Sequence, residues 1–444
     1  MRKTKLYLTS LGCAKNRVDS EMMLGKLSNS GWVITSHPEE AETIIINTCS
    51  FIESAINESI DTILELAQHK KNGLCKKLIV AGCLPERYRE KIMPALPEVD
   101  VFLGTGAFDK IIQAARDITT QPQCILPDPD SIAVQDMPSH RVLTTQHMAY
   151  LKIAEGCSRH CTYCIIPKLR GKLKSRSLES IVSEASFLVS SGVKELILVA
   201  QDTTSYGTDL EPEVFIGKLL ERLANISEHM WTRLLYANPE SVTSSFIKTV
   251  ASHANICSYY DIPIQHASDS VLKKMGRRYT RSDLYRLFHT IKENDHDATL
   301  RTTAMVGFPG ETDADFNMLL QFIKDIRFSH LGTFLYSDSK DILSHKLDNH
   351  VAEEKAKERY DRLMSCQQDI SFEINTQHMG NIYQVLVEEA SDENTYKGRT
   401  YFQTPESDGI TYIHPSKPHD LHAGQFAQIR IVNALEYDLI GDVA

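Results

Sequence analysis

The sequence lacks the dense cysteines of a disulfide-rich protein and has no long apolar stretch. Ten cysteines among 444 residues are too few for a disulfide scaffold. No run approaches the roughly 18 uninterrupted apolar residues of a transmembrane helix, and the opening MRKTKLYLTS lacks the apolar core and cleavage site of a signal peptide. Internal repeats and low-complexity tracts are also lacking. We therefore expect a cytoplasmic protein without membrane association, long enough for about two to four domains.

Three of the cysteines form a CxxxCxxC motif. Cys157, Cys161 and Cys164 lie in the stretch GCSRHCTYCIIPKLRG, directly after an apolar run that predicts a strand. Three thiolates cannot ligate all four irons of a [4Fe–4S] cluster, so the spacing predicts a cluster with one open iron that an exogenous molecule could bind. A zinc site completed by a fourth ligand such as His160 is the alternative, although structural zinc sites usually pair their cysteines as CxxC.

A second group of three cysteines follows three predicted strands near the N-terminus. The apolar runs KLYLTSLGC, ETIIINTC and KKLIVAGC end at Cys13, Cys49 and Cys83, and helix-like stretches separate them. This alternation predicts a parallel sheet with helices on both faces, in which ligands bind at the carboxyl ends of the strands. We therefore expect the three cysteines to meet at one edge and to hold a second cluster. Three unrelated buried thiols are the alternative.

The middle of the chain repeats the alternation on a larger scale. Six strand-like runs separated by helical stretches predict an open (βα)6 partial barrel. These runs are Met148–Ala154, Glu195–Ala200, Arg233–Tyr236, Tyr259–Ile264, Ala298–Val306 and His330–Tyr336. Sites on β/α barrels form at the carboxyl ends of the strands, where the CxxxCxxC loop follows the first run. Gln201, Gln265 and the stretch GFPGE from Gly307 follow other runs, although such loops are often rich in turn and capping residues.

The remaining segments differ in pattern. Residues 119–147 carry four prolines and predict a linker, residues 351–379 predict one long amphipathic helix, and the last segment alternates with a period of two, as in a small antiparallel β-barrel. The fold class is therefore α/β with a C-terminal β-barrel. The predicted domains are 1–133, a linker at 134–147, 148–374 including the long helix, and 375–444.

With these motifs the sequence resembles the radical S-adenosylmethionine (SAM) methylthiotransferases over its whole length. CxxxCxxC with Tyr163 before the last cysteine is typical of the radical SAM superfamily, and the triplet of Cys13, Cys49 and Cys83 is typical of its methylthiotransferases. LGCAKNRVDSE, DIPIQH, GFPGET and the CxxxCxxC loop are most similar to the RimO branch, which modifies an aspartate of protein twelve of the small ribosomal subunit. The resemblance implies a flavodoxin-like N-terminal domain, a radical SAM barrel and a C-terminal TRAM domain of the OB-like type.

The resemblance also implies an enzyme that uses two [4Fe–4S] clusters and SAM. The cluster on Cys157, Cys161 and Cys164 would bind SAM through its amine and carboxylate and cleave it to methionine and a 5′-deoxyadenosyl radical. Such a radical can remove hydrogen from an unactivated carbon such as the aspartate β-carbon. The second cluster would carry the sulfur, a second SAM would supply the methyl group, and both clusters should face one cavity so that the substrate radical meets the sulfur before it is quenched.

Other requirements follow from the same resemblance. An external reductant and an external sulfur source are needed. No side chain is assigned as a catalytic acid or base. The candidates for holding SAM are Tyr163, Gln201, Gln265, Arg301, Gly307 and Gly310.

Charge favours a basic protein over a nucleic acid as the partner. The chain has a net charge of −10, and its last segment, 376–444, has four basic residues (Lys397, Arg399, Lys417 and Arg430) against ten acidic ones. Nucleic-acid binding depends on Lys and Arg that neutralise phosphates, whereas an acidic surface attracts a basic ribosomal protein. The basic residues between Arg159 and Arg176 could contact a nucleic acid as a second partner. Most runs of charged residues, however, are simply solvated faces of the protein. A tRNA adenosine methylthiotransferase of the same family and a non-catalytic iron–sulfur or zinc-binding module remain as alternatives.

Overall fold

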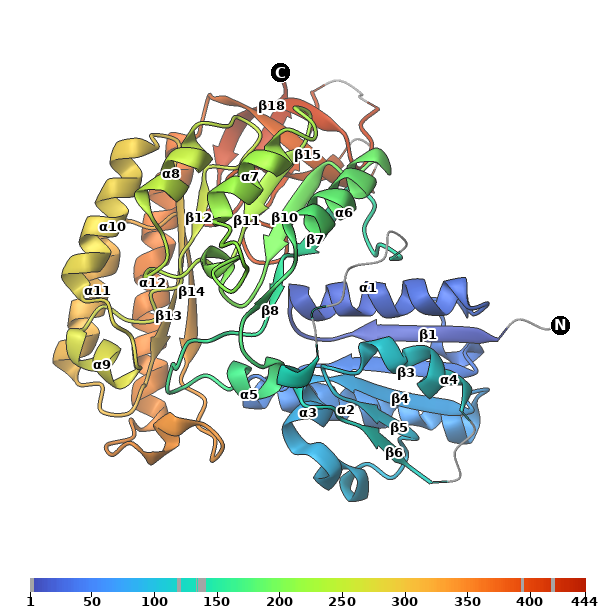
Figure 1. Ribbon diagram of the computed structural model, residues 1–444. Helices are drawn as coiled ribbons and strands as arrows, with labels where there is room; N and C mark the ends of the chain where they lie inside the picture. Colours follow the sequence, from blue (N-terminus) through green and yellow to red (C-terminus); the bar gives the residue numbers. More distant parts are fainter. Residues whose placement is uncertain (1–3, 118–120, 133, 135–140, 393–394, 417–419) are drawn as a thin grey trace.

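The computed structural model describes residues 4–117, 121–132, 134, 141–392, 395–416 and 420–444. Figure 1 shows an N-terminal sheet domain, a central barrel of strands and helices, and a C-terminal β-barrel, in chain order. The predicted α/β fold class is confirmed. Across the described ranges, no helix is both long and apolar enough to cross a membrane.

The N-terminal domain is built on a six-stranded parallel sheet with the strand order β2-β1-β3-β4-β5-β6. This is the flavodoxin-like order with one further strand at the edge. The strands are β1 (Lys5–Ser10), β2 (Val33–Ile34), β3 (Thr43–Thr48), β4 (Lys77–Gly82), β5 (Val101–Leu103) and β6 (Gln123–Ile125). The α-helices are α1 (Ala14–Asn29), α2 (Glu53–Asn72), α3 (Cys83–Tyr88) and α4 (Ile111–Arg116). β6 lies inside the stretch 119–147 that predicts a linker, of which residues 135–140 lie outside the described ranges.

Both faces of this sheet are covered, which explains its unbroken apolar strands. Ile44 and Ile46 of β3 point to the face covered by α2 and α3, whereas Ile45 points to the face covered by α1 and α4. Successive side chains of a strand point to opposite faces, so a strand buried on both sides is apolar throughout. The carboxyl ends of β1, β3 and β4 consequently lie side by side, each followed by one cysteine of the N-terminal triplet.

The central domain contains all six strands that the sequence predicts. They form two parallel three-stranded sheets, β11-β10-β7 and β12-β13-β14, joined by a bridge between Thr232 and Ile256. The strands are β7 (Met148–Lys152), β10 (Glu195–Val199), β11 (Trp231–Leu234), β12 (Tyr259–Asp261), β13 (Thr299–Val306) and β14 (His330–Leu335), with a short antiparallel pair, β8 (Ala154–Glu155) and β9 (Lys174–Ser175). The α-helices are α5 (Ile166–Arg170), α6 (Leu178–Ser190), α7 (Ile216–Ala224), α8 (Ser244–Ala251), α9 (Asp269–Lys274), α10 (Arg281–Asn294) and α11 (Asp313–Ile326).

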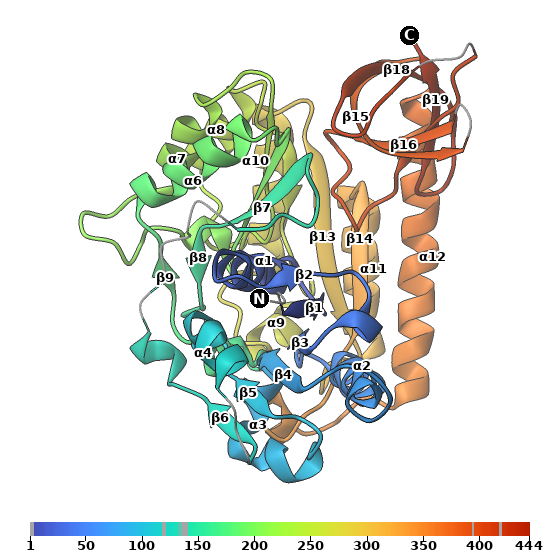
Figure 2. The same cartoon turned by 90° about the vertical axis from the view of Figure 1, so that its right-hand side faces the viewer.

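A long helix connects this barrel to the C-terminal domain. Helix α12 (Glu353–Gln377) runs beside β14 and α11 and leads to the last domain, as Figure 2 shows. That domain is a closed barrel with the strand order β15-β16-β17-β19-β18. Its strands are β15 (Ile382–Asp392), β16 (Thr395–Thr400), β17 (Thr411–Ile413), β18 (Phe426–Ala434) and β19 (Leu439–Val443). The pairing of β17 with β19 is parallel, whereas the other pairings are antiparallel as expected.

A loop of the C-terminal domain closes the amino end of the central barrel. Between β16 and β17, the carbonyl oxygen of Tyr401 accepts a hydrogen bond from Arg233 at 2.6 Å, and Asp408 accepts one from Tyr259 at 2.5 Å. Arg399 donates to Glu195 at 2.6 Å, and Glu195 also accepts from Arg233 at 2.7 Å. No local pattern in the sequence predicts this contact, because it joins charged residues far apart in the chain.

Glu195 is the group on which this closure depends, since it is fully buried between two arginines. Replacing one partner of a buried ion pair leaves an unpaired buried charge. We expect Glu195→Gln to lower the free energy of unfolding by about 3–5 kcal/mol, measured by chemical denaturation. The matched control is Lys357→Gln, which breaks an exposed pair with Glu353 and should leave the free energy of unfolding almost unchanged. Equal losses in the two variants would contradict the structural role of Glu195.

Candidate active site

The CxxxCxxC loop is folded back on itself and fastened to the barrel. The Cys157 amide donates to the Gly171 carbonyl oxygen at 3.0 Å, and the Thr162 amide donates to that of Met275 at 3.0 Å. Gly156 has φ +78° and lies so close to the Lys172 carbonyl oxygen that no side chain would fit there. Burial raises the pKa of the Cys157 thiol, and it raises the pKa of Cys164 to about 12. Both thiols interact electrostatically with Cys161, so the loop brings the three sulfur atoms into one region.

The N-terminal triplet lies at the carboxyl edge of its sheet, as the strand pattern predicts. Cys13 directly precedes α1, Cys49 follows β3, and Cys83 is the first residue of α3. A side chain at Gly12 would place its Cβ 2.6 Å from the Cβ of Cys49, so glycine permits the close approach of these two loops. Burial raises the pKa of the Cys49 thiol and raises that of Cys83 to about 12.

The donor atoms at the two positions suit iron–sulfur clusters. Each position offers three thiols, and soft sulfur ligands favour such clusters. Buried thiols with raised pKa values must lose their protons when they bind metal, so cluster binding releases protons. Within the described ranges, no three Cys, His, Asp or Glu side chains form a preformed metal-binding group. The ligand role of the six cysteines therefore stays a prediction.

One arginine connects the two triplets. Arg170, at the end of the CxxxCxxC loop, donates to Asn16 at 2.5 Å and to Asp19 at 2.8 Å in α1. It also donates to Glu155 at 3.2 Å and to the Cys83 sulfur at 3.6 Å.

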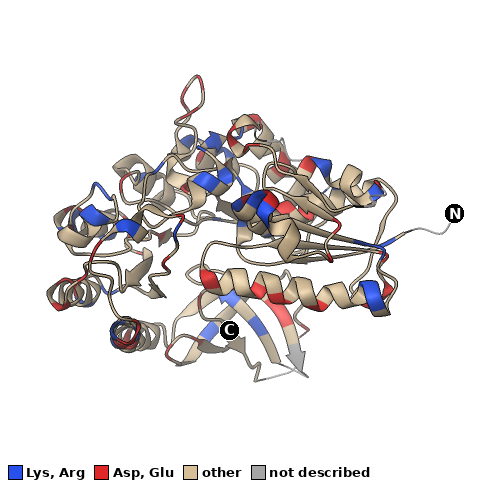
Figure 3. Ribbon diagram, turned by 90° about the horizontal axis from the view of Figure 1, so that it is seen from below, with Lys and Arg blue, Asp and Glu red and all other residues tan. Residues whose placement is uncertain are grey.

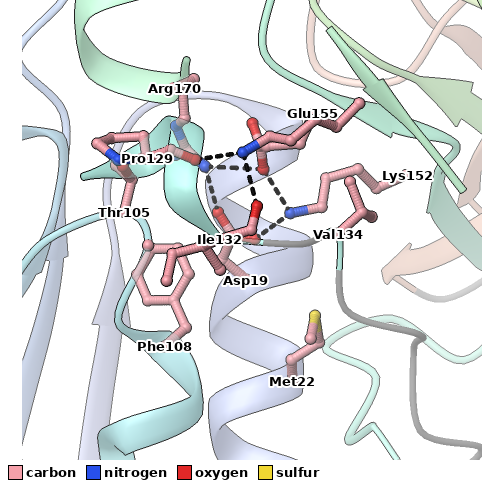
Figure 4. A pocket seen from close by; sticks show the side chains of 12 residues that line it. Asp19, Met22, Thr105, Phe108, Pro129, Ile132, Val134, Lys152, Glu155 and Arg170 are labelled. Carbon is pink, nitrogen blue, oxygen red and sulfur yellow. Dashed lines mark hydrogen bonds and ion pairs between the residues drawn. The ribbon is translucent and has the colours of Figure 1, made fainter. Parts of the chain in front are cut away.

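A lysine completes this network. The ammonium group of Lys152 bridges Asp19 at 2.5 Å and Glu155 at 2.8 Å. Figure 4 shows these charged side chains converging from the N-terminal domain and the barrel beside a small cavity of about 60 Å³. Burial raises the pKa of Glu155, but Lys152 and Arg170 outweigh it and hold that pKa below its ordinary value.

Two of the predicted SAM-binding side chains lie where a barrel ligand is expected. Gln201 follows β10 and donates to Glu155 at 2.6 Å, whereas its other amide atom, Oε1, is buried without a hydrogen-bond partner among the described residues. Gln265 has φ +64°, and backbone bonds to Thr303 and Met305 hold it in this left-handed conformation. Non-glycine residues in this conformation are rare and gather at functional sites. These placements support a binding role for both glutamines.

The other four predicted contacts serve the fold in this structure. Tyr163 accepts a hydrogen bond from Arg277 at 2.5 Å and packs edge-on against Phe308. Arg301 lies near the amino end of β13 and pairs with Asp261 at 2.8 Å and Asp408 at 3.3 Å.

The two glycines permit close packing. The amide of Gly307 donates to the buried Glu311 carboxylate at 2.5 Å, and a side chain at Gly307 would place its Cβ 2.6 Å from the Cβ of Ala356 in α12. At Gly310 the φ of +75° disfavours a side chain, and the flexible end of Lys274 occupies the adjacent space. Neither observation supports a SAM contact, and the roles of all six residues stay predictions.

Comparison with known families and proteins decides the family. Three family models match the chain: the uncharacterized protein family UPF0004 at residues 5–104, the radical SAM superfamily at 151–323 and the TRAM domain at 379–444. A protein of Desulfosudis oleivorans named ribosomal protein uS12 methylthiotransferase RimO is 49% identical over 439 residues, which are 99% of each chain. A protein of the same name from Clostridioides difficile is 47% identical over 440 residues, covering 99% of this chain and 98% of the relative. This chain belongs to the RimO family.

Solved structures agree on the fold. The radical SAM methyltransferase TsrM from Kitasatospora setae, with cobalamin and a [4Fe–4S] cluster bound, has a TM-score of 0.55 at 14% identity, covering 89% of this chain and 77% of that chain. The radical SAM enzyme OxsB has a TM-score of 0.53 at 12% identity, and the match covers 83% of this chain and 56% of OxsB. As a RimO family member, the chain is a radical SAM methylthiotransferase, and SAM and [4Fe–4S] clusters are the cofactors of this family. The RimO relatives do not favour the tRNA-modifying alternative.

Sequence reasoning missed three residues of this RimO site. Glu155 could have been noticed as a carboxylate between an apolar strand and Gly156. Lys15, whose Nζ lies 3.5 Å from the ring centroid of Tyr236 at the carboxyl end of the barrel, could have been noticed because it is a cation in the first turn of α1, where a helix N-terminus favours negative charge. Arg170 stood out only as one member of a basic run, because its partners lie far away in the sequence.

Arg170 should be required for cooperation between the two triplets. Arg170→Met leaves Asp19 and Glu155 partly unpaired in a buried place, so we expect a loss of about 3–5 kcal/mol in the free energy of unfolding. We also expect less methylthiolated product for each 5′-deoxyadenosine released. The control is Lys168→Met on the same helix, whose side chain is 54% exposed and 3.6 Å from Asp341. An Arg170→Met enzyme with the wild-type product ratio would show that Arg170 does not couple the sites.

Proposed function

We propose that this enzyme adds a methylthio group to the β-carbon of an aspartate side chain in ribosomal protein uS12. The supporting observation is the connection of two cysteine triplets through Arg170 in a chain whose full-length relatives are named uS12 methylthiotransferases. When bound, a cluster on Cys157, Cys161 and Cys164 supplies the electron that cleaves SAM, and a cluster on Cys13, Cys49 and Cys83 supplies the place for the transferred sulfur. We further propose that uS12 is modified in the cytoplasm, with an external reductant and an external sulfur source.

The residues of the chain position these groups. Arg170 and Lys152 hold α1 against the strand that leads into the CxxxCxxC loop, which keeps the two triplets close. The Gln201 amide is oriented by Glu155, and its Oε1, which has no partner among the described residues, would be able to accept a hydrogen bond from a bound cofactor. Proximity is required because a substrate radical formed at one triplet must react with sulfur held at the other.

Substitutions can distinguish the roles of the two cysteine triplets. We expect Cys49→Ala to abolish the methylthiolated product while reductive formation of 5′-deoxyadenosine continues, because only the sulfur-delivering position is lost. Cys161→Ala should abolish both, and anaerobic reconstitution should give about eight irons in the wild type and about four in either variant. Mass spectrometry of uS12 should detect the product as a gain of about 46 Da, a methylthio group replacing hydrogen. Normal product formation by Cys49→Ala would refute the assignment of the N-terminal triplet.

We also propose that acidic surfaces guide the basic uS12 protein to the site. In the C-terminal domain, Glu388 and Asp408 are engaged in ion pairs with Arg399 and Arg301, and Lys417 lies outside the described residues. The net negative charge of this domain therefore acts only through its remaining carboxylates. Helix α2 supplies four exposed carboxylates without an ion pair among the described residues: Glu53, Glu58, Asp61 and Glu65. Acidic residues along this helix are red in Figure 3.

This steering predicts a dependence on salt. Combining Glu58→Gln, Asp61→Asn and Glu65→Gln should raise the KM for uS12 several-fold at low ionic strength, and the difference should shrink as salt screens the charges. The control neutralises three exposed carboxylates around α7, namely Glu213, Glu221 and Glu228. Equal effects of both triple variants would mean that only overall net charge matters, and would count against α2 as the guiding surface.

A further inference from the structure

Lys15 reaches from the N-terminal domain into the mouth of the barrel. It is the second residue of α1, two positions after Cys13, and its Nζ lies 3.5 Å from the ring centroid of Tyr236. Tyr236 follows β11 at the carboxyl end of the barrel. Lys15 also interacts electrostatically with Cys13 and with Glu155, the residue just before the CxxxCxxC loop. The ammonium group therefore lies beside the N-terminal triplet, on the side that faces the barrel and the strand leading into the CxxxCxxC loop.

The charge of Lys15 is not balanced by a carboxylate contact. Arg170 and Lys152 each pair with Asp19 and Glu155, and Arg159 pairs with Asp202 and Glu240. Among the residues that the structure describes, Lys15 has no ion pair within 4.0 Å and no hydrogen bond. The first turn of α1 contains no acidic residue, and the helix dipole adds further positive potential there. This position therefore favours an anionic ligand.

Tyr236, against which Lys15 packs, is held in an unusual conformation. Its φ is +63°, in the left-handed region that residues with side chains rarely adopt. The Tyr236 amide donates a hydrogen bond to the Asp261 carboxylate at 2.8 Å, and the Ala237 amide donates one to the Asp261 carbonyl oxygen at 2.9 Å. Backbone strain maintained by surrounding contacts is typical of ligand-binding positions. The ring thus provides a fixed surface that holds the ammonium group at the mouth.

We propose that Lys15 binds the side-chain carboxylate of the substrate aspartate. This inference rests on the proposed function. SAM carries a carboxylate too, but in this family that group is expected on the open iron of the CxxxCxxC cluster, which leaves the substrate carboxylate without a partner. The carboxylate carbon is bonded directly to the β-carbon of aspartate. An ammonium group that holds the carboxylate therefore fixes the reacting carbon between the two triplets.

The test compares two peptides on the reconstituted full-length enzyme. One peptide spans the modified aspartate of uS12, and the other has asparagine at that position, which is nearly the same size without the charge. Wild type should bind the aspartate peptide about tenfold or more tightly than the asparagine peptide, the range of a charge-assisted hydrogen bond. Lys15→Met should bind both peptides equally weakly, whereas Lys15→Arg should retain most of the preference. The matched control is Lys26→Met, in the last turn of the same helix.

Each outcome separates this inference from the proposed function. Wild-type enzyme that adds no methylthio group to the aspartate peptide overturns both. Wild-type enzyme that modifies the peptide, together with a Lys15→Met variant that keeps the preference for aspartate, overturns only the role of Lys15. A Lys15→Met variant that keeps this preference and loses iron would show that the lysine balances the charge of the neighbouring cluster instead. Loss of the preference with a full iron content supports carboxylate binding.

Discussion

The arrangement of the two halves of the active site depends on the buried guanidinium group of Arg170. Its planar set of donors reaches α1, the strand before the CxxxCxxC loop and the sulfur of Cys83 simultaneously. A lysine has a single donor group and could not make these contacts in three directions. A buried charge without partners is strongly unfavourable, so the domain arrangement that satisfies Arg170 is also the one that places the triplets together. Arg87, which binds Asp341 of the barrel at 2.7 and 2.9 Å, fastens the same interface at a second place.

A second chain of contacts links the C-terminal domain to the barrel mouth. Asp408 pairs with Arg301, Arg301 pairs with Asp261, and Asp261 holds the backbone of Tyr236. The strands of the barrel carry the fully buried Glu195 and Arg233 and the half-buried Arg301, and such charges require partners. The loop between β16 and β17 supplies several of these partners. The C-terminal domain is therefore part of the framework of the active site, in addition to any role in recognising a partner.

The sequence predicts most of the fold because each domain has a simple apolar pattern. The strands of the parallel sheet and of the barrel follow from short unbroken apolar runs, helix α12 follows from a period of 3.6 residues, and the C-terminal barrel follows from a period of two. The carboxyl-edge positions of Cys13, Cys49 and Cys83 follow from the strand ends alone. In contrast, the roles of Arg170, Glu195 and Asp408 depend on partners more than 100 residues away, which no local pattern encodes. The SAM contact predicted for Arg301 rests on the family resemblance alone. This residue lies near the amino end of β13, where it pairs with Asp261 and Asp408, and its role stays a prediction.

Two sets of charges would select the protein substrate, one at long range on the surface and one at short range in the barrel mouth. In the proposed steering, exposed carboxylates on α2 would act over about 10 Å through solvent and attract any basic protein, so they would add to the association rate but give little specificity. Within the mouth, Lys152, Arg159 and Arg170 are all neutralised by carboxylates of the chain itself. An uncompensated ammonium group in this partly desolvated place acts at short range and favours a negatively charged side chain over a neutral one. A basic protein that presents a single acidic residue satisfies both conditions, whereas an acidic protein is repelled at the surface and a wholly basic segment is repelled by Lys15.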